Sequence, residues 1–185
     1  MSRPLRILLV NKAYPPHIGG IETLVRQYAR YFQTQFSAEV QVLVCQEKGK
    51  TARETIGGVP VLRAGSIGTY FSCPLSGSFL RYFRKYAKQA DVVMIHMPFP
   101  LADLACLLSG YRGRVVLAWH SDVIKQKTLL RFYAPLLRWL LRRADCILTA
   151  TQGHIDSSAF LPVVREKCKV IPYGIDLSLI HISEP

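Results

Sequence analysis

Residues 5–20 have the sequence LRILLVNKAYPPHIGG, and this stretch decides the fold. Residues 5–10 are apolar except Arg6, which predicts a buried β-strand. Two prolines and two glycines among residues 11–20 indicate a loop. The apolar residues that follow recur at helical spacing: Ile21, Leu24, Val25, Tyr28 and Phe32. A strand, a glycine-containing loop and a helix in this order are typical of the start of a Rossmann-like α/β domain.

Gly19 and Gly20 stand where this helix is expected to begin. The first backbone N–H groups of a helix have no partner within the helix, and glycine lets a phosphate approach them closely. The dinucleotide pattern G-x-G-x-x-G is absent, and no Gly-Lys-Ser/Thr follows as in a P-loop. Two interpretations remain open, a phosphate contact and a turn that needs a positive φ.

The composition is that of one globular domain, with 185 residues of which 50% are hydrophobic. The formal net charge of +12 favours anionic partners, namely nucleic acid, acidic lipid or a phosphorylated substrate. No stretch has the pattern of a membrane span or a signal peptide, so we expect a cytoplasmic protein. The five cysteines are scattered without a C-x-x-C pair, which predicts neither a metal site nor a disulfide framework.

Strands are expected to alternate with helices along the rest of the chain. Further strands are predicted at residues 40–44, 59–63, 91–95, 114–119, 146–149 and 169–171. Helices are predicted at residues 79–90, 101–108, 129–143 and 153–160, and Pro135 must kink or restart the third of these. Residues 46–58 are expected to form a polar, hairpin-like stretch and residues 65–77 a long loop. The predicted fold class is α/β, a Rossmann-like parallel sheet of about seven strands with helices on both faces.

Polar residues follow the carboxyl ends of the predicted strands, where open parallel sheets bind ligands. They are Asn11, His96, His120, Ser121, Asp122, Thr149, Thr151, Tyr173 and Asp176. Because these strand ends lie along one edge of the sheet, we expect a binding site there. His120 is the favoured candidate, since a histidine with a near-neutral pKa can contact a substrate hydroxyl or move a proton.

Structural interpretations stand beside these functional ones. His120 and His96 could each bond the backbone at a strand end, and Glu22 could cap the start of its helix. Asp176 could fix a turn. His17 and His154 are expected to be solvent-facing loop residues.

Two predicted helices combine cationic and aromatic residues. In the first, the cations are Arg81, Arg84, Lys85 and Lys88, opposite an apolar face. Around the second they are Lys125, Lys127, Arg131, Arg138, Arg142 and Arg143, interleaved with Phe132, Tyr133 and Trp139. For either helix alone, an ordinary solvent-exposed face is the better explanation. For the two helices together, peripheral contact with an anionic membrane explains the pattern as well as solvent exposure does. No nucleic-acid-binding motif is present, so nucleic acid is not expected as a partner.

Five segments in this order resemble the N-terminal domain of family-four retaining glycosyltransferases of the GT-B fold. They are YPPHIGGIE at residues 14–22, HMP at 96–98, HSD at 120–122, TAT at 149–151 and IPYGID at 171–176. Each segment is weak alone, but the ordered set covers nearly the whole chain.

The resemblance implies two Rossmann-like domains that face each other across a cleft. The N-terminal domain binds the acceptor, and the C-terminal domain binds a UDP- or GDP-linked sugar, which is a substrate and not a cofactor. The resemblance places Gly19 and Gly20 near the donor diphosphate and makes His120 the catalytic candidate. It implies acceptor contacts from Glu22, His96, Ser121, Asp122, Thr149 and Tyr173. It also implies retention of anomeric configuration and lipid-linked or envelope-glycan acceptors, in agreement with membrane contact through Arg81, Arg84, Lys85 and Lys88.

The chain departs from the family pattern at its end. We expect the family domain to span residues 1–178 and residues 179–185 to be a foreign tail that resembles translated adapter sequence. The C-terminal donor domain is then absent, and such a half-enzyme is expected to have negligible transferase activity alone.

Two other functions remain open. A non-catalytic Rossmann-like module that binds a membrane or a polyanion fits the charge and the basic helices. A nicotinamide-dependent oxidoreductase is disfavoured, because the glycine fingerprint is missing. The sequence does not specify the sugar, the nucleotide, the acceptor or the oligomeric state.

Overall fold

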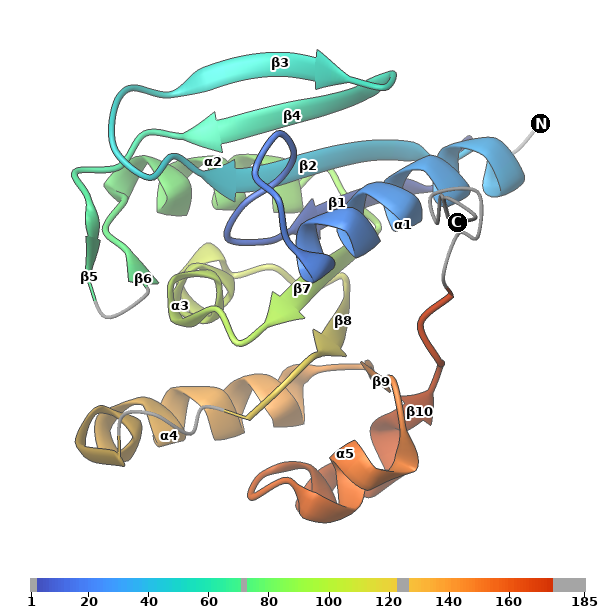
Figure 1. The fold of residues 1–185 in the computed structure, drawn as a ribbon, viewed down its shortest axis with the longest axis vertical. Helices are drawn as coiled ribbons and strands as arrows, with labels where there is room; N and C mark the ends of the chain where they lie inside the picture. The colour runs from blue at the N-terminus through green and yellow to red at the C-terminus, as the bar shows by residue number, and fades with distance from the viewer. Residues whose placement is uncertain (1–2, 71–72, 123–126, 175–185) are drawn as a thin grey trace, which may run out of the picture.

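The computed structural model describes residues 3–70, 73–122 and 127–174. Its centre is an eight-stranded sheet with the strand order β10-β9-β8-β7-β1-β2-β4-β3 (Figure 1). The strands are β1 (Arg6–Val10), β2 (Glu39–Cys45), β3 (Ala52–Ile56), β4 (Val59–Ala64), β7 (Val92–Met97), β8 (Arg114–Trp119), β9 (Cys146–Thr149) and β10 (Cys168–Val170). Neighbouring strands are parallel except β3 and β4. The predicted α/β class with a mainly parallel sheet is confirmed.

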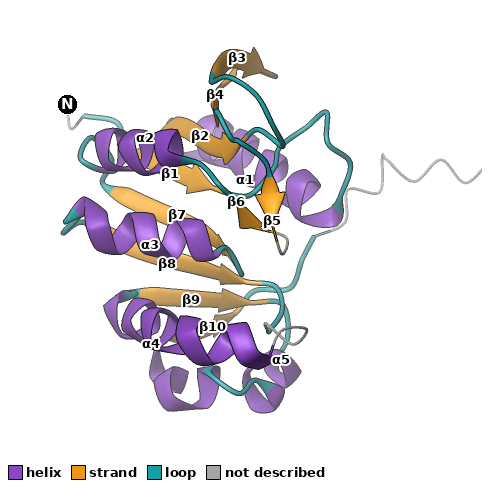
Figure 2. Cartoon of the chain, turned by 90° about the vertical axis from the view of Figure 1, so that its left-hand side faces the viewer, coloured by secondary structure: helices purple, strands orange, loops and turns teal. Residues whose placement is uncertain are grey.

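Strand β1 lies within the sheet and is buried on both of its faces. Leu8 and Val10 pack into one core cluster, and Ile7 and Leu9 pack into the other, as the alternation of side chains along a strand requires. Helices α2 (Gly77–Ala87), α3 (Pro100–Ser109) and α4 (Lys127–Arg143) cover the first cluster. Helix α1 (Gly20–Phe36) covers the second. Figure 2 shows α2, α3 and α4 together on one face with α1 behind the sheet, so helices on both faces are confirmed.

The amphipathic patterns explain these helices, with corrections at their ends. Phe79, Phe83 and Ala87 form the buried stripe of α2. This helix begins earlier than predicted because Ser76 caps it, with the Phe79 N–H donating to the Ser76 hydroxyl at 3.0 Å. Pro135 lies inside α4, which is one helix from Lys127 to Arg143. Of the two predicted effects of Pro135, a kink or a restart, the restart is wrong.

The eighth strand was not predicted. Residues 46–58 contain β3, which pairs antiparallel with β4 across a turn at Gly57 and Gly58, both with positive φ. β3 is largely exposed and polar, and therefore lacks the apolar signal of a buried strand. The predicted loop at residues 65–77 contains two short paired strands, β5 (Thr69–Tyr70) and β6 (Cys73–Pro74).

The last described elements differ from the prediction in length. Helix α5 (Gln152–Ser157) is shorter than the helix predicted at residues 153–160. A 3₁₀ helix, η1 (Leu161–Lys167), follows it and was not predicted. Lys125, Asp176 and the predicted tail at residues 179–185 lie outside the described residues.

Candidate functional site

The carboxyl ends of the parallel strands lie along one edge of the sheet, on the right in Figure 2, and several predicted site residues lie there. His120 directly follows β8, and its backbone N–H donates to the Met97 carbonyl at 3.3 Å. His96 lies inside β7 opposite Ala118, so the prediction that it follows the strand is wrong. The strand order changes direction between β1 and β7, the kind of position where open α/β sheets bind ligands.

Three predicted site residues from three parts of the chain form one hydrogen-bonded row. The Nδ1 atom of His96 lies 3.0 Å from Nε2 of His120. The Nδ1 atom of His120 lies 2.5 Å from the Tyr173 hydroxyl. His96 is 2% exposed, whereas Tyr173 is 41% exposed. The row therefore runs from the protein interior to the surface at the carboxyl edge.

Both histidines of this row are uncharged at neutral pH. Burial, together with the neighbouring His120, lowers the pKa of His96 to about 3. Burial, with a smaller effect of His154, lowers the pKa of His120 to about 4. A neutral imidazole carries one N–H and one bare nitrogen, so His120 can orient a hydroxyl group but is a poor source of positive charge at pH 7.

The glycine loop leads into the first turn of α1. Gly19 is the N-cap with an extended φ of −178°, and Gly20 is not among the glycines with positive φ. The interpretation as a turn that needs a positive φ is therefore wrong. A Cβ added at Gly20 would meet no atom within 4 Å, so the space beside it is open. Among the described residues no side chain caps this helix, which leaves its first N–H groups free to bind an anion.

Glu22 and His17 lie beside this helix start. Oε1 of Glu22 is 3.7 Å from Nδ1 of His17, and a Cβ added at Gly19 would collide with Oε2 of Glu22. Glu22 therefore lies over the N-cap but makes no capping hydrogen bond. The side chain of His17 is 50% exposed, as predicted for a solvent-facing residue.

Asp122 supports the loop after β8. Its Oδ1 accepts from the Trp119 indole N–H at 3.1 Å and from the Ser158 hydroxyl at 2.8 Å, and its Oδ2 accepts from the Ala159 N–H at 2.9 Å. These contacts tie the loop to the segment after α5. Its neighbour Ser121 is exposed and offers a free surface position.

Thr149 stands at the end of its strand, as predicted, whereas His154 differs from its expected setting. Thr149 is the last residue of β9, is 1% exposed, and donates to the Thr151 carbonyl at 3.3 Å. His154 lies on α5, and its Nδ1 is buried without a hydrogen-bond partner among the described residues. His154 is half-buried on a helix, so the prediction that it is a solvent-facing loop residue is wrong.

A second polar cluster at this edge was missed. Asp103 of α3 is fully buried and accepts a hydrogen bond from the Tyr133 hydroxyl of α4, while its Oδ1 has no partner among the described residues. Burial raises the pKa of Asp103 to about 7, and the charge of Lys12 partly opposes this. Burial also lowers the pKa of Lys12. The signal available in the sequence was Lys12 itself, a cation two residues after the end of β1.

Arg63 of β4 was also missed, and it holds the glycine loop in place. Its Nη1 donates to the Tyr14 carbonyl at 3.2 Å, and its Nη2 donates to the Pro15 carbonyl. Its Nε donates to Glu54, and its side chain is 12% exposed. The loop that leads to Gly19 and Gly20 is thus fixed from a strand far away in the sequence.

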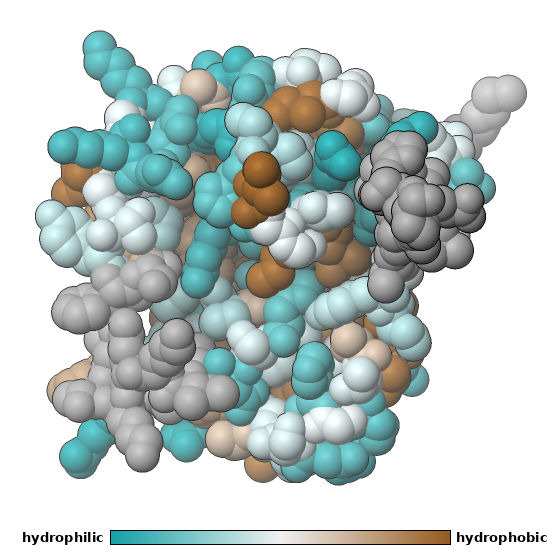
Figure 3. Space-filling view, in the orientation of Figure 1, coloured by the Kyte–Doolittle hydropathy of each residue, from teal (hydrophilic) through white to brown (hydrophobic). Residues whose placement is uncertain are grey.

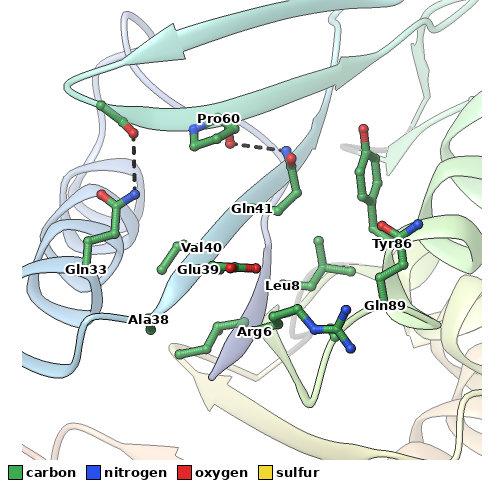
Figure 4. Close-up of a pocket in the computed structure, with 13 residues that line it drawn as sticks. Arg6, Leu8, Gln33, Ala38, Glu39, Val40, Gln41, Pro60, Tyr86 and Gln89 are labelled. Atoms are coloured by element: carbon green, nitrogen blue, oxygen red, sulfur yellow. Dashed lines mark hydrogen bonds between the residues drawn. The ribbon is translucent and has the colours of Figure 1, made fainter. Parts of the chain in front are cut away.

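A hollow of about 470 Å³ lies at the opposite edge of the sheet (Figure 4). Its walls include the first residues of β1 and β2, Arg6 and Glu39, and residues near the carboxyl ends of α1 and α2, Gln33 and Tyr86. It is therefore at the amino ends of the strands. We place the candidate site at the carboxyl edge because the histidine row and the open helix N-terminus lie there.

The surface of the described residues gives three further facts. No group of three or more His, Cys, Asp or Glu side chains within them could hold a metal ion. None of their helices combines the length and apolarity that crossing a membrane requires. On the face seen in Figure 3, apolar residues form separate patches between hydrophilic ones.

The comparison with protein-family models identifies one family. The model of "Glycosyltransferase Family 4" matches residues 18–179. A D-rhamnosyltransferase, WbpZ of Pseudomonas aeruginosa, is 34% identical over 93% of this chain and 45% of its own length. An O-antigen chain mannosyltransferase C of Escherichia coli is 30% identical over 93% of this chain and 46% of its own length. The chain thus spans about half the length of these curated relatives.

The fold has solved counterparts. Anabaena HepE, determined in complex with UDP and glucose, superposes with a TM-score of 0.60 at 18% identity over 94% of this chain and 46% of that one. A likeness at this identity shows a shared fold, and the family match over residues 18–179 adds the relationship in sequence. The chain belongs to glycosyltransferase family 4.

Proposed function

We propose that this chain is the acceptor-binding domain of a retaining glycosyltransferase that transfers a sugar from a nucleotide-sugar to a cell-envelope glycan. The observation that carries the proposal is the 34% identity to a named D-rhamnosyltransferase over 93% of the chain. The second relative, named for O-antigen synthesis, supports an envelope glycan as the acceptor class.

The proposal assigns donor binding mainly to a second domain. The family match over residues 18–179 supports residues 1–178 as the family domain of this chain. HepE was solved with UDP and glucose, which supports a UDP-linked donor, with a GDP-linked donor as the alternative. The nucleotide-sugar is a substrate, so no separate cofactor is required.

The geometry supports distinct roles for the site residues. Gly19 and Gly20 contact the donor diphosphate, since the first turn of α1 is open and uncapped. His120 orients the transferred sugar and the acceptor, and Ser121, Glu22 and Tyr173 line the acceptor side. Three further residues shape the site from beneath its surface: His96, Thr149 and Asp122. His96 and Thr149 are buried, and both carboxylate oxygens of Asp122 accept hydrogen bonds from the protein.

Nucleotide release tests the transferase proposal. The 185-residue chain and the same chain continued through its downstream reading frame are incubated with UDP- and GDP-sugars and with glycan or lipid-linked acceptors. We expect release only from the longer chain, and a loss of roughly tenfold or more in its His120→Ala variant, about the effect of one lost hydrogen bond at the reacting centre.

Gly20→Val has a matched control in Gly77→Val. Both glycines open a helix, and a Cβ at either position would meet no atom within 4 Å. Gly20→Val should abolish release by closing the anion site, whereas Gly77→Val should retain it. Equal nucleotide release by the two variants would contradict the proposed contact of Gly20 with the donor diphosphate. If the longer chain releases no nucleotide from any donor, the alternative function, a non-catalytic binding module, is favoured.

We also propose that the face formed by α2, α3 and α4 contacts an anionic membrane surface. α3 exposes Leu104, Leu107 and Leu108 between its neighbours α2 and α4. The exposed cations beside them are Arg81, Arg84, Lys85 and Lys88 of α2 and Arg131, Arg138 and Arg142 of α4. Leucines flanked by cations fit the boundary between lipid tails and anionic headgroups. Such a contact would place the enzyme at the cytoplasmic face of a membrane.

Liposome sedimentation tests this contact. Arg84→Gln/Lys85→Gln should lower binding to anionic vesicles, and Lys48→Gln/Lys50→Gln, which removes two exposed cations near β3, should leave it unchanged. Added salt should weaken binding, because the attraction is screened. Equal losses in the two double variants would point to net charge alone.

A further inference from the structure

His96 has an unusual position in the row His96–His120–Tyr173. Its side chain is 2% exposed, so it does not reach a ligand at the surface. Its Nδ1 pairs with His120, but its Nε2 is buried and has no hydrogen-bond partner among the described residues. A buried polar atom without a partner costs stability, which indicates a functional reason for this histidine.

The two imidazole rings meet edge to edge. Their planes differ by 11° and their centroids are 5.2 Å apart, while the facing nitrogens are 3.0 Å apart. Stacked faces would stay roughly 3.5 Å apart, so rings whose nitrogens are closer than this lie side by side in nearly one plane. An N–H of one ring then points along the lone pair of the other, which is the geometry of a good hydrogen bond.

Only one proton lies between His96 and His120. Both side chains are neutral at pH 7, since burial lowers both pKa values, to about 3 and about 4. Each ring therefore carries one N–H, and the pair has two arrangements. Either His96 donates through Nδ1 to Nε2 of His120, or His120 donates through Nε2 to Nδ1 of His96.

The unpartnered atom of His96 distinguishes these arrangements. If His120 donates, the only proton of His96 sits on the buried Nε2 and has no acceptor. If His96 donates, its Nε2 is a bare nitrogen and every N–H of the pair has an acceptor. Buried N–H groups without an acceptor are rarer in proteins than under-satisfied acceptors, which favours His96 as the donor.

We propose that His96 is a positioning residue, which donates its Nδ1 proton to His120 and so fixes His120 in the tautomer that carries its proton on Nδ1. The proposal rests on the function proposed above for His120 and Tyr173. It gives His96 a task in the site although it touches no substrate.

The fixed tautomer sets the direction of the whole row. With the proton of His120 on Nδ1, His120 donates to the oxygen of Tyr173, which lies 2.5 Å away. The hydroxyl hydrogen of Tyr173 is then free, and this side chain is 41% exposed. Tyr173 therefore offers a donor, strengthened by the chain behind it, to an oxygen of the sugar or of a phosphate.

Nitrogen NMR of the ring atoms reads the tautomer directly in the 185-residue chain labelled with ¹⁵N-histidine. At pH 7, His120 should have a protonated Nδ1 and a bare Nε2, and His96 a protonated Nδ1. The signals of His120 are assigned by their loss in His120→Asn. A protonated Nε2 on His120 in the wild-type chain overturns the proposal, whether or not any variant folds.

Two variants of His96 test its control over His120. His96→Asn keeps an amide nitrogen near the place of Nδ1 and should preserve the tautomer. His96→Leu, checked for folding by circular dichroism, removes the donor, so the share of His120 that carries its proton on Nε2 can only stay the same or rise. A lower share of Nε2-protonated His120 in folded His96→Leu than in the wild-type chain also overturns the proposal.

Kinetics of the longer chain test whether the control matters for transfer. His96→Leu should lower kcat roughly tenfold with little change in the acceptor KM, and His96→Asn should restore kcat. Tyr173→Phe should lower kcat by a similar factor. The double variant should lose no more than either single one, because both act through one row. If the kcat losses of the two single variants multiply in the double variant, this step is overturned. A wild-type chain without transfer would count against the proposed function, and the NMR result would still decide the tautomer.

Discussion

Individual side chains at the carboxyl edge are tuned by burial more than by charge. His96, His120 and Asp103 are all held near their neutral forms because the protein interior disfavours charge. The effects on stability have opposite signs. The two histidines resist protonation, so their contribution is lost as the pH falls below about 6.5, towards pKa values of about 3 and 4. Asp103 resists deprotonation, so its contribution to the free energy of unfolding is lost as the pH rises.

Asp103→Asn should remove a pH dependence of stability. The pKa of Asp103 is raised from 3.8 to about 7, so the folded protein holds this proton more tightly than the unfolded chain. Between pH 4 and 7 this group alone lowers stability as the pH rises, by up to about 1.4 kcal/mol per pH unit. Asn still accepts from Tyr133. Because the two histidines act in the opposite direction below about pH 6.5, the test is the difference between the two proteins: urea denaturation from pH 4 to 8 should show the stability of Asp103→Asn rising relative to wild type as the pH rises.

Tyr133→Phe is the companion variant. The Tyr133 hydroxyl lowers the pKa of Asp103 by donating to it, so its removal should move the decline to higher pH. Identical pH profiles for wild type and both variants would show that Asp103 stays ionised, contrary to its burial.

The regular elements were largely predictable, whereas contacts between distant elements were not. β1 and β8 have continuous apolar runs, so their type and place followed from the sequence alone. β3 was not predicted, because an exposed edge strand needs no apolar pattern in its sequence. The Tyr14 and Pro15 carbonyls that Arg63 binds are 49 and 48 residues away from it, and Tyr133 is 30 residues from Asp103. Such pairs are set by packing, which periodicity does not encode.

Arg63→Gln should loosen the glycine loop. The variant loses the planar fork that holds the carbonyls of Tyr14 and Pro15. We expect a loss of about 1–3 kcal/mol, a fall in Tm of several degrees, and faster hydrogen exchange in residues 13–20. Arg112→Gln, on an exposed arginine, is the control and should change neither quantity. Unchanged hydrogen exchange of residues 13–20 in Arg63→Gln would mean that the loop is stable without the contacts of Arg63.

Ser76→Ala should shorten or destabilise α2. Ser76 accepts from the Phe79 N–H at 3.0 Å and donates to the Gly65 carbonyl at 2.6 Å. Loss of an N-cap costs about 1 kcal/mol. Ser78→Ala is a matched control, because Ser78 also donates to Gly65 but caps nothing. Thermal unfolding should rank Ser76→Ala below Ser78→Ala, and equal values would argue against the cap.

At the scale of the whole molecule, the net charge of +12 opposes folding through self-repulsion. Raising salt from about 0.01 M to 0.15 M shortens the screening length from about 30 Å to about 8 Å. Calorimetry should therefore show a higher Tm at the higher salt. The four changes Arg81→Gln, Arg84→Gln, Lys85→Gln and Lys88→Gln should weaken this dependence. A Tm that falls with salt would mean that attractive ion pairs outweigh the repulsion.

The antiparallel hairpin of β3 and β4 has a consequence for how the protein behaves at high concentration. A parallel sheet that ended at β4 would present unpaired N–H and C=O groups to other chains, which is a common start of aggregation. β3 occupies that position and carries exposed Arg53 and Glu54 on its surface. Charged side chains on an edge strand discourage a further strand from pairing there. The hairpin therefore acts as a barrier against ribbon-like self-association along this side of the sheet.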